Sequence, residues 1–202
     1  MKLKFTILAA AALVAAAPFA QAANVALGAS VTTTGSGFGN SAGWDNAALA
    51  APSTVTDGIL LPVGQQWDTN TVFWAGGAPD DADVITITLA QASSITGLQL
   101  EADNNDLYTV SYEDLGGTWH DLATIAPNTD SGWGLGDGSA SFGAVSALAL
   151  QIHASGGDGY YAVAELAAEG NTLPAVPEPA SALLMLAGLG ALASVARRRK
   201  AQ

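Results

Sequence analysis

The chain has 202 residues, no cysteine and a formal net charge of −12. The lack of cysteine excludes a disulfide framework, thiol catalysis and metal sites with cysteine ligands. No Lys or Arg lies between Phe5 and Ala196, whereas all 18 Asp and Glu residues lie in that stretch. A body without cations cannot neutralise a nucleic-acid backbone or clamp a phosphate, so the charge pattern argues against nucleic-acid binding and kinase-like chemistry.

The N-terminal segment has the order of a secretory signal peptide. Lys2 and Lys4 precede an apolar run from Phe5 to Ala17, and the small residues Ala20 and Ala22 follow. The run is shorter than a membrane span, and the A-x-A pattern fits signal peptidase, so residues 1–22 are predicted to be cleaved off after Ala22. A permanent membrane anchor is the alternative. The mature chain is therefore expected outside the cytoplasm.

Residues 23–170 show the pattern of an all-β domain. Short runs of β-branched and apolar residues alternate with clusters of Gly, Asn, Asp and Ser, without long helical periodicity. Val84–Leu89, with the sequence VITITL, alternates strictly between apolar and polar residues. The other expected strands are 24–34, 95–101, 107–112, 119–125, 145–153 and 160–168. Short strands at this spacing favour an antiparallel β-sandwich over a parallel α/β sheet.

Acidic loops are the first candidates for a binding site. The segments 80–83 and 103–106 each place several carboxylate or amide oxygens close together, as calcium requires. Asp137 and Asp158 each lie between two glycines, as in calcium-binding β-rolls, but two isolated copies do not form an array. For each loop taken alone, solvated turn residues are the simpler interpretation.

Aromatic side chains are the second candidates, because the body holds all five tryptophans. Trp44, Trp74 and Trp133 fall in loop-like sequence close to Asp or Asn side chains. A sugar ring can stack on an exposed indole face while neighbouring polar groups bond its hydroxyls. We therefore expect these three residues to bind carbohydrate, with burial of any one of them as the alternative.

Signals for catalysis are weak. His120 and His153 are the only histidines, and the chain holds no HExxH, G-x-S-x-G, P-loop or dinucleotide-binding motif. Paired carboxylates could hydrolyse glycosides, but chance pairs are expected among so many carboxylates. The sequence therefore favours a protein that is not an enzyme.

The C-terminal region combines three features. A linker over 171–179 ends in Pro177-Glu178-Pro179, an uncharged stretch follows over 180–196, and the basic tail 197–202 closes the chain. Prolines favour a stiff, extended linker. A helix over 180–196 would be roughly 25 Å long, slightly short of a hydrocarbon core of about 30 Å. This pattern predicts a weak transmembrane helix with its basic tail in the cytoplasm.

This arrangement resembles the PEP-CTERM sorting signal of Gram-negative bacteria that make exopolysaccharide. The matching residues are Pro177, Glu178, Pro179, Arg197, Arg198 and Arg199. The resemblance implies recognition by an exosortase, a membrane transpeptidase that acts near the Pro-Glu-Pro motif. It also implies transient anchoring in the inner membrane, followed by a place at the cell surface or outside the cell. An ordinary single-span anchor is the alternative.

The body resembles the discoidin-like, or galactose-binding-like, jelly roll, which includes carbohydrate-binding modules and coagulation-factor type C domains. The matching segments, in chain order, are 24–29, 56–58 with Trp67, 84–100, 108–119 and 161–166. The resemblance implies an antiparallel jelly-roll β-sandwich in which Trp67 and Trp119 belong to the core. This body departs from the family in having no Arg or Lys around its loops.

The same resemblance implies one structural calcium between Asp57, in a D-G loop, and Glu165 of the last strand. Backbone carbonyls would complete the six to eight oxygens that calcium needs. An Asx turn at Asp57 is the alternative. Together these features predict an exported surface or matrix protein that binds polysaccharide. A purely structural matrix protein and a secreted polysaccharide hydrolase are the alternatives.

Overall fold

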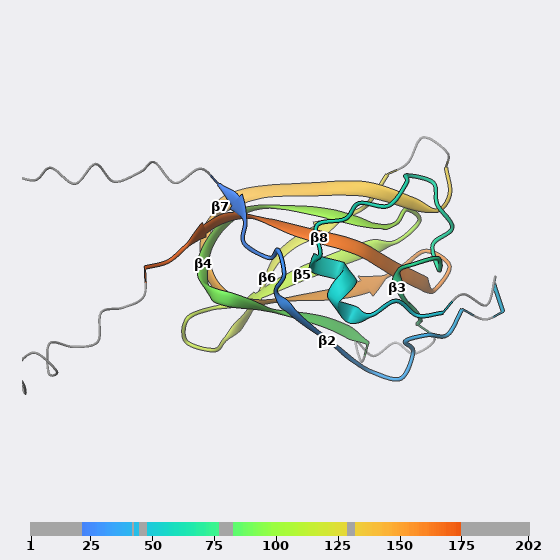
Figure 1. The fold of residues 1–202 in the computed structure, drawn as a ribbon, viewed down its shortest axis with the longest axis horizontal. Helices are drawn as coiled ribbons and strands as arrows, with labels where there is room; N and C mark the ends of the chain where they lie inside the picture. The colour runs from blue at the N-terminus through green and yellow to red at the C-terminus, as the bar shows by residue number, and fades with distance from the viewer. Residues whose placement is uncertain (1–21, 42, 45–47, 77–82, 129–131, 175–202) are drawn as a thin grey trace, which may run out of the picture. The chain divides into compact units, whose positions relative to one another are not determined.

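The computed structural model describes residues 22–41, 43–44, 48–76, 83–128 and 132–174 (Figure 1). Its regular structure is antiparallel β-sheet with one short 3-10 helix, which confirms the predicted fold class. The predicted signal peptide, transmembrane helix, basic tail and all residues of the sorting motif lie outside these ranges. Within them, no helix is long and apolar enough to cross a membrane.

Within the described residues, eight strands and one 3-10 helix follow one another. They are β1 (Ala23–Asn24), β2 (Ser30–Thr34), η1 (Pro52–Thr56), β3 (Val72–Ala75), β4 (Val84–Asp103), β5 (Leu107–Glu113), β6 (Trp119–Ile125), β7 (Leu135–Ser155) and β8 (Tyr160–Thr172). The hydrogen-bonded order is β1-β8-β4-β7-β5-β6, with β2 pairing β4 and β3 pairing β8.

The two longest strands, β4 and β7, belong to both layers of the sandwich. Their register shifts between Thr88 and Ser93, where β4 bends back on itself (Figure 1). Before the bend β4 pairs with β2 and with the end of β7, and after it β4 pairs with the beginning of β7. The segments 84–89 and 95–101, expected as separate strands, are therefore the two arms of one bent strand.

The core lies between these layers and follows the alternation seen in the sequence. Ile85 and Ile87 are buried on one arm of β4, and Leu98 and Leu100 are buried on the other. Because successive side chains of a strand point to opposite faces, the residues between them face away from the core. This geometry places Glu101 on the outer face of the second layer.

The beginning of β7 was missed by the sequence analysis because it is rich in glycine. A side chain at Gly136 or Gly138 would collide with the segment 125–128, which runs against the strand. Asn128 exchanges backbone hydrogen bonds with Asp137 there, at 2.9 and 3.0 Å. Glycine in a strand marks such a close approach of another backbone segment.

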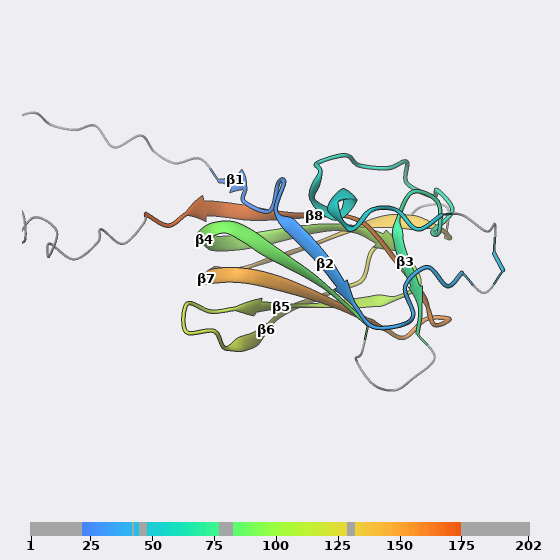
Figure 2. The same ribbon diagram turned by 60° about the horizontal axis from the view of Figure 1, so that its bottom comes forward.

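The connections gather at one end of the sandwich. The strand ends that flank the β3–β4, β4–β5, β6–β7 and β7–β8 connections lie there, and the described chain between β2 and β3 also passes this end (Figure 2). The hairpin between β5 and β6 and the bend of β4 lie at the opposite end. We call the first end the loop-rich end.

Candidate functional site

Asp57 and Glu165 lie close together although they are far apart in the sequence. Gly58, which follows Asp57, is 107 positions away from Glu165 along the chain and is hydrogen-bonded to it. Asp57 ends η1, and its Oδ1 accepts the Ile59 N–H at 2.8 Å, which is the Asx turn considered above. The Gly58 N–H donates to both oxygens of Glu165, each at 3.2 Å. The turn therefore covers the Glu165 carboxylate, which is only 3% exposed.

The Glu165 carboxyl group is buried close to other acidic groups. Burial raises its pKa to about 7, and the nearby charges of Asp57 and Glu101 add to the shift. Carboxylate and carbonyl oxygens are the ligands that calcium prefers. Asp57 and Glu165 supply oxygen atoms of this kind, but two side chains alone do not complete a calcium shell.

Beside this pair runs a hollow on the outer face of the second layer, which we call the outer trough. It has a volume of about 360 Å³, and Leu60, Glu101, Asp137 and Glu165 are among its lining residues. Leu61 N–H donates to Glu101 Oε2 at 2.9 Å, while Glu101 Oε1 is buried and has no hydrogen-bond partner among the described residues. Burial, with the charge of Asp137, raises the pKa of Glu101. Glu101 was not among the site residues predicted from the sequence.

A second acidic group, the loop cluster, lies at the loop-rich end. It consists of Asp103 and Asp106, which flank the β4–β5 connection, and Asp158 in the β7–β8 connection. Burial, together with the charge of Asp158, raises the pKa of Asp103 to about 7. Burial, together with the charges of Asp103 and Asp158, raises the pKa of Asp106 to about 8. Asp103 and Asp106 are thus buried carboxylates rather than the solvated turn residues that the sequence suggested.

Side chains alone do not form a metal centre anywhere in the described ranges. No group of three or more His, Asp or Glu side chains is close enough there to hold a metal ion. A cation at either acidic group would therefore need backbone carbonyls and water as well. Of the acidic loop 80–83, only Asp83 is described, and its Oδ1 accepts the Gly37 N–H at 2.9 Å.

Two of the three tryptophans expected to bind carbohydrate are exposed. Trp44 is 55% exposed between β2 and β3, and Trp133 is 57% exposed between β6 and β7. The backbone N–H of Trp44 donates to the Ser41 carbonyl at 3.0 Å, and the Ser41 hydroxyl donates to the backbone carbonyl of Trp44 at 3.0 Å. Gly134, with φ +76°, lies against the backbone of residues 64–65, which holds the chain next to Trp133.

The expectation that Trp74 lies in a binding loop is wrong. Trp74 belongs to β3, is 1% exposed and packs against Phe38 and Tyr161, with ring centroids 5.2 and 5.6 Å apart. Its strand pairs with β8, so its indole points into the core between the two layers. The continuous apolar run Val72-Phe73-Trp74 was the signal that could have shown this.

Of the two tryptophans that were predicted to lie in the core, one is buried and the other is exposed. Trp67 is buried against Phe73 and Tyr160, which confirms its predicted core position. Trp119 is 37% exposed, so its predicted core position is wrong. It begins the edge strand β6 beside the β5–β6 turn, where only one neighbouring strand covers it.

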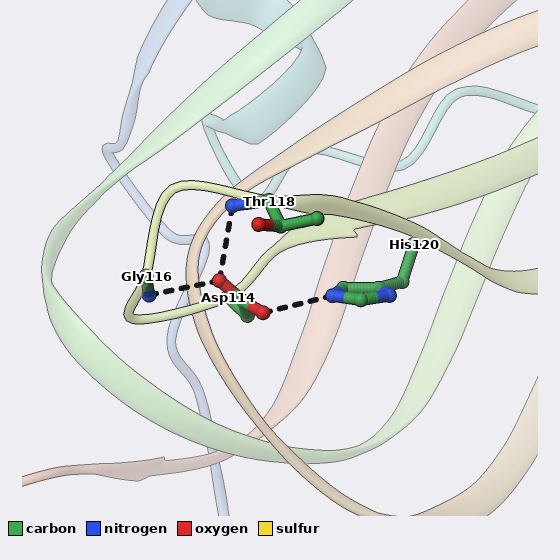
Figure 3. Close-up of polar contacts among 4 residues, drawn as sticks. All are labelled: Asp114, Gly116, Thr118 and His120. Carbon is green, nitrogen blue, oxygen red and sulfur yellow. Dashed lines mark hydrogen bonds and ion pairs between the residues drawn. The ribbon is translucent and has the colours of Figure 1, made fainter.

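The histidines belong to local structure. In the β5–β6 turn, Asp114 Oδ1 accepts the N–H groups of Gly116 and Thr118 at 2.8 and 3.0 Å, and Asp114 Oδ2 lies 2.8 Å from His120 Nε2 (Figure 3). The Thr118 N–H and the His120 contact lower the pKa of Asp114. His153 lines a separate hollow of about 250 Å³ with Ser111 and Asp121. There the Ser111 hydroxyl donates to Asp121 Oδ1 at 3.0 Å.

A bent-strand antiparallel sandwich with its connections gathered at one end defines a galactose-binding-like jelly roll. Solved structures with this architecture include carbohydrate-binding modules. The lectin domain of lectinolysin, complexed with Lewis B antigen, matches at TM-score 0.50 and 12% identity over 74% of this chain and 97% of that chain. The CBM32-4 module of CpGH89 from Clostridium perfringens, complexed with GlcNAc-α-1,4-galactose, matches at TM-score 0.46 and 18% identity over 74% and 95%.

A third match, to SpGH29, has TM-score 0.46 and 15% identity over 75% of this chain, and it spans only 28% of that longer chain. Identities this low show a shared fold and not a shared ligand. Residues 175–200 match the PEP-CTERM protein-sorting motif, which confirms the predicted sorting signal and indicates an exported protein. No curated protein sequence matches the chain.

Proposed function

We propose that the chain is a sorted cell-surface or extracellular-matrix protein whose sandwich binds exopolysaccharide through its loop-rich end. The observation that carries this proposal is the exposure of Trp44 and Trp133, both of which lie in connections at that end. An indole that is more than half exposed leaves apolar surface in contact with water, and a sugar ring stacked on it would cover that surface.

The charge of the body narrows the class of polysaccharide. No Lys or Arg lies between Phe5 and Ala196, so the surface cannot balance the charge of an acidic polymer. Like charges repel at long range and slow association. The ligand class that the surface accepts is therefore a neutral polysaccharide.

Calcium completes the proposal as a structural ion rather than a reactive one. Asp57 and Glu165 would hold it, with backbone carbonyls of the D-G turn as further ligands. The ion would supply positive charge to the buried Glu165 carboxylate, which has no cationic partner in the described part of the chain. The ion would hold the D-G turn in place, and Leu60, which follows this turn, lines the outer trough.

The sorting motif supports the route to the cell surface. Signal peptidase would remove residues 1–22, and an exosortase-type enzyme would act near Pro177–Pro179 after a transient stay in the inner membrane. The sandwich itself has no catalytic assignment in this proposal.

Affinity electrophoresis in gels containing neutral or acidic exopolysaccharide tests the binding proposal. Trp44→Ala and Trp133→Ala should each weaken retardation by the neutral polymer, since stacking surface is lost without opening a core cavity. Trp119→Ala is the matched control, because this tryptophan is exposed at the opposite end of the sandwich. Circular dichroism checks that each variant is folded.

Equal retardation of all three variants would refute the assignment of the loop-rich end. Absence of retardation by any polysaccharide would favour a purely structural matrix protein instead. Release of reducing sugar from the polymer would show a hydrolase.

A further inference from the structure

The segment 57–65, which we call the strap, lies over three neighbouring strands on the outer face of the second layer. It is hydrogen-bonded to β8 through Gly58, to β4 through Leu61 and to β7 through Gly64. Between Gly58 and Leu61, the side chain of Leu60 is 67% exposed and lines the outer trough. The strap therefore adds an apolar wall to a hollow that is otherwise lined by strand residues.

Three carboxylates line this hollow, one from each strand: Glu165 from β8, Glu101 from β4 and Asp137 from β7. β4 lies between β8 and β7, and Glu101 and Asp137 are direct cross-strand partners. Neighbouring strands are about 4.8 Å apart, so the carboxylates form a row across the sheet. Among the described residues, no three His, Asp or Glu side chains are close enough to hold one metal ion. The row therefore does not fit a single small ion.

Glu101, in the middle of the row, has incomplete hydrogen bonding. It is 2% exposed, and its Oε1 has no partner among the described residues, whereas its Oε2 accepts the Leu61 N–H at 2.9 Å. A buried polar atom without a partner is costly, so this carboxyl group calls for a balancing charge or a proton. No Lys or Arg lies between Phe5 and Ala196, so a balancing positive charge must come from outside the body.

The trough is open to solvent at Asp137, because this side chain is exposed. A cation bound there would contact Asp137 directly, and the two buried glutamates would also attract it, since charges interact more strongly where water is excluded. None of the described residues around the trough is aromatic, so it lacks the stacking surface on which a sugar ring packs. Its exposed leucine suits methylene groups instead.

We infer that the outer trough binds a linear aliphatic diamine or oligoamine. The ammonium groups would follow the row of carboxylates, and the methylene groups between them would pack against Leu60. Such a cation is extended, so it can reach carboxylates that are too far apart to share one metal ion. The volume of about 360 Å³ lies within the range of small-molecule sites. The trough shares no residue with the carbohydrate site proposed above, so the two proposals stand or fall separately.

Isothermal titration of the full chain with putrescine tests the inference, in EDTA so that calcium does not compete at Glu165. One putrescine should bind per chain. Butanediol, which has the same carbon chain with hydroxyls in place of the ammonium groups, should not bind. Butylamine, which keeps one ammonium group, should bind at least about tenfold more weakly, because it loses a charge-assisted contact.

Variants of the row test where the diamine binds. Asp137→Asn, an exposed change that leaves the core intact, and Glu101→Gln should each weaken putrescine binding by about tenfold. Asp121→Asn removes one carboxylate charge from β6, outside the trough, and is the matched control that should bind as the unaltered chain does. In methyl NMR spectra, the Leu60 resonances should shift with putrescine and not with butanediol.

The inference is overturned if putrescine binds no more tightly than butanediol, or if Asp137→Asn and Glu101→Gln both bind it as Asp121→Asn does. In that case a proton alone balances Glu101. D-glucosamine carries its ammonium group on a sugar ring, and tighter binding of D-glucosamine than of putrescine would overturn the linear ligand in favour of an amino sugar.

Discussion

Replacement of Trp74 by Ala is the sharpest test of the observed core. The indole is 1% exposed and packs in tilted contacts against Phe38 and Tyr161. Loss of a buried Trp costs about 3–5 kcal/mol, since transfer energy is lost and a cavity remains. A domain has only about 5–15 kcal/mol of stability, so the variant should lose a large fraction of it. For a domain of about 150 residues, the melting temperature should fall by roughly 10–15 °C.

Urea unfolding followed by far-ultraviolet circular dichroism measures this loss without relying on tryptophan fluorescence. Trp133→Ala is the matched control, because its side chain is 57% exposed and its loss should change the free energy of unfolding by less than about 0.5 kcal/mol. Should Trp74→Ala fail to fold, Trp74→Phe keeps a ring in place and should cost about 1–2 kcal/mol. A loss below about 1 kcal/mol for Trp74→Ala, or equal losses for Trp74 and Trp133, would refute the placement of Trp74 in the core.

Three further predictions follow from buried charge, backbone geometry and sorting. In EDTA the free energy of unfolding should fall as pH rises from 5 to 8. The pKa values of Asp103 and Glu165 are raised to about 7 and that of Asp106 to about 8, so the folded state holds more protons than the unfolded state over this range. Urea titrations at several pH values measure this slope, and a rise in stability with pH would contradict it. Gly157→Ala should lower stability by about 1–2 kcal/mol, because φ is +55° and the new methyl group meets Asp106. Thermal unfolding should show no such loss for Gly143→Ala, which has open space around it. Intact mass of secreted protein should show loss of residues 1–22 and of the segment after the Pro-Glu-Pro motif; release of chains that keep the basic tail would speak against sorting.

Local patterns in the sequence were enough to predict the fold class. The alternation of Val84–Leu89 predicts a half-buried strand, and the structure buries Ile85, Ile87 and Leu89 while its threonines face outward. The order of proline motif, apolar stretch and basic tail predicts the sorting signal at residues 175–200. Such features depend only on neighbouring residues, so a single chain displays them directly.

The candidate sites could be identified only from the tertiary structure, because the residues that form them are far apart in the sequence. Trp74 and Trp133 both stand beside polar loops, and the short apolar run before Trp74 is the one local sign that they differ. Burial is decided by which strand pairs with β3 and by what covers its face. The resemblance had paired Asp57 with Glu165, but it said nothing of the buried Glu101 beside them.

The loop cluster shows the same division. The sequence Asp103-Asn104-Asn105-Asp106 displays its oxygens, and as an isolated segment it is most simply a solvated turn. The structure buries both carboxylates and brings Gly157 and Asp158 against them from the other connection. Periodicity and composition therefore determined the class of fold and the sorting route. Long-range pairing decided which charges are buried together, because only the folded chain removes water from groups that the sequence keeps apart.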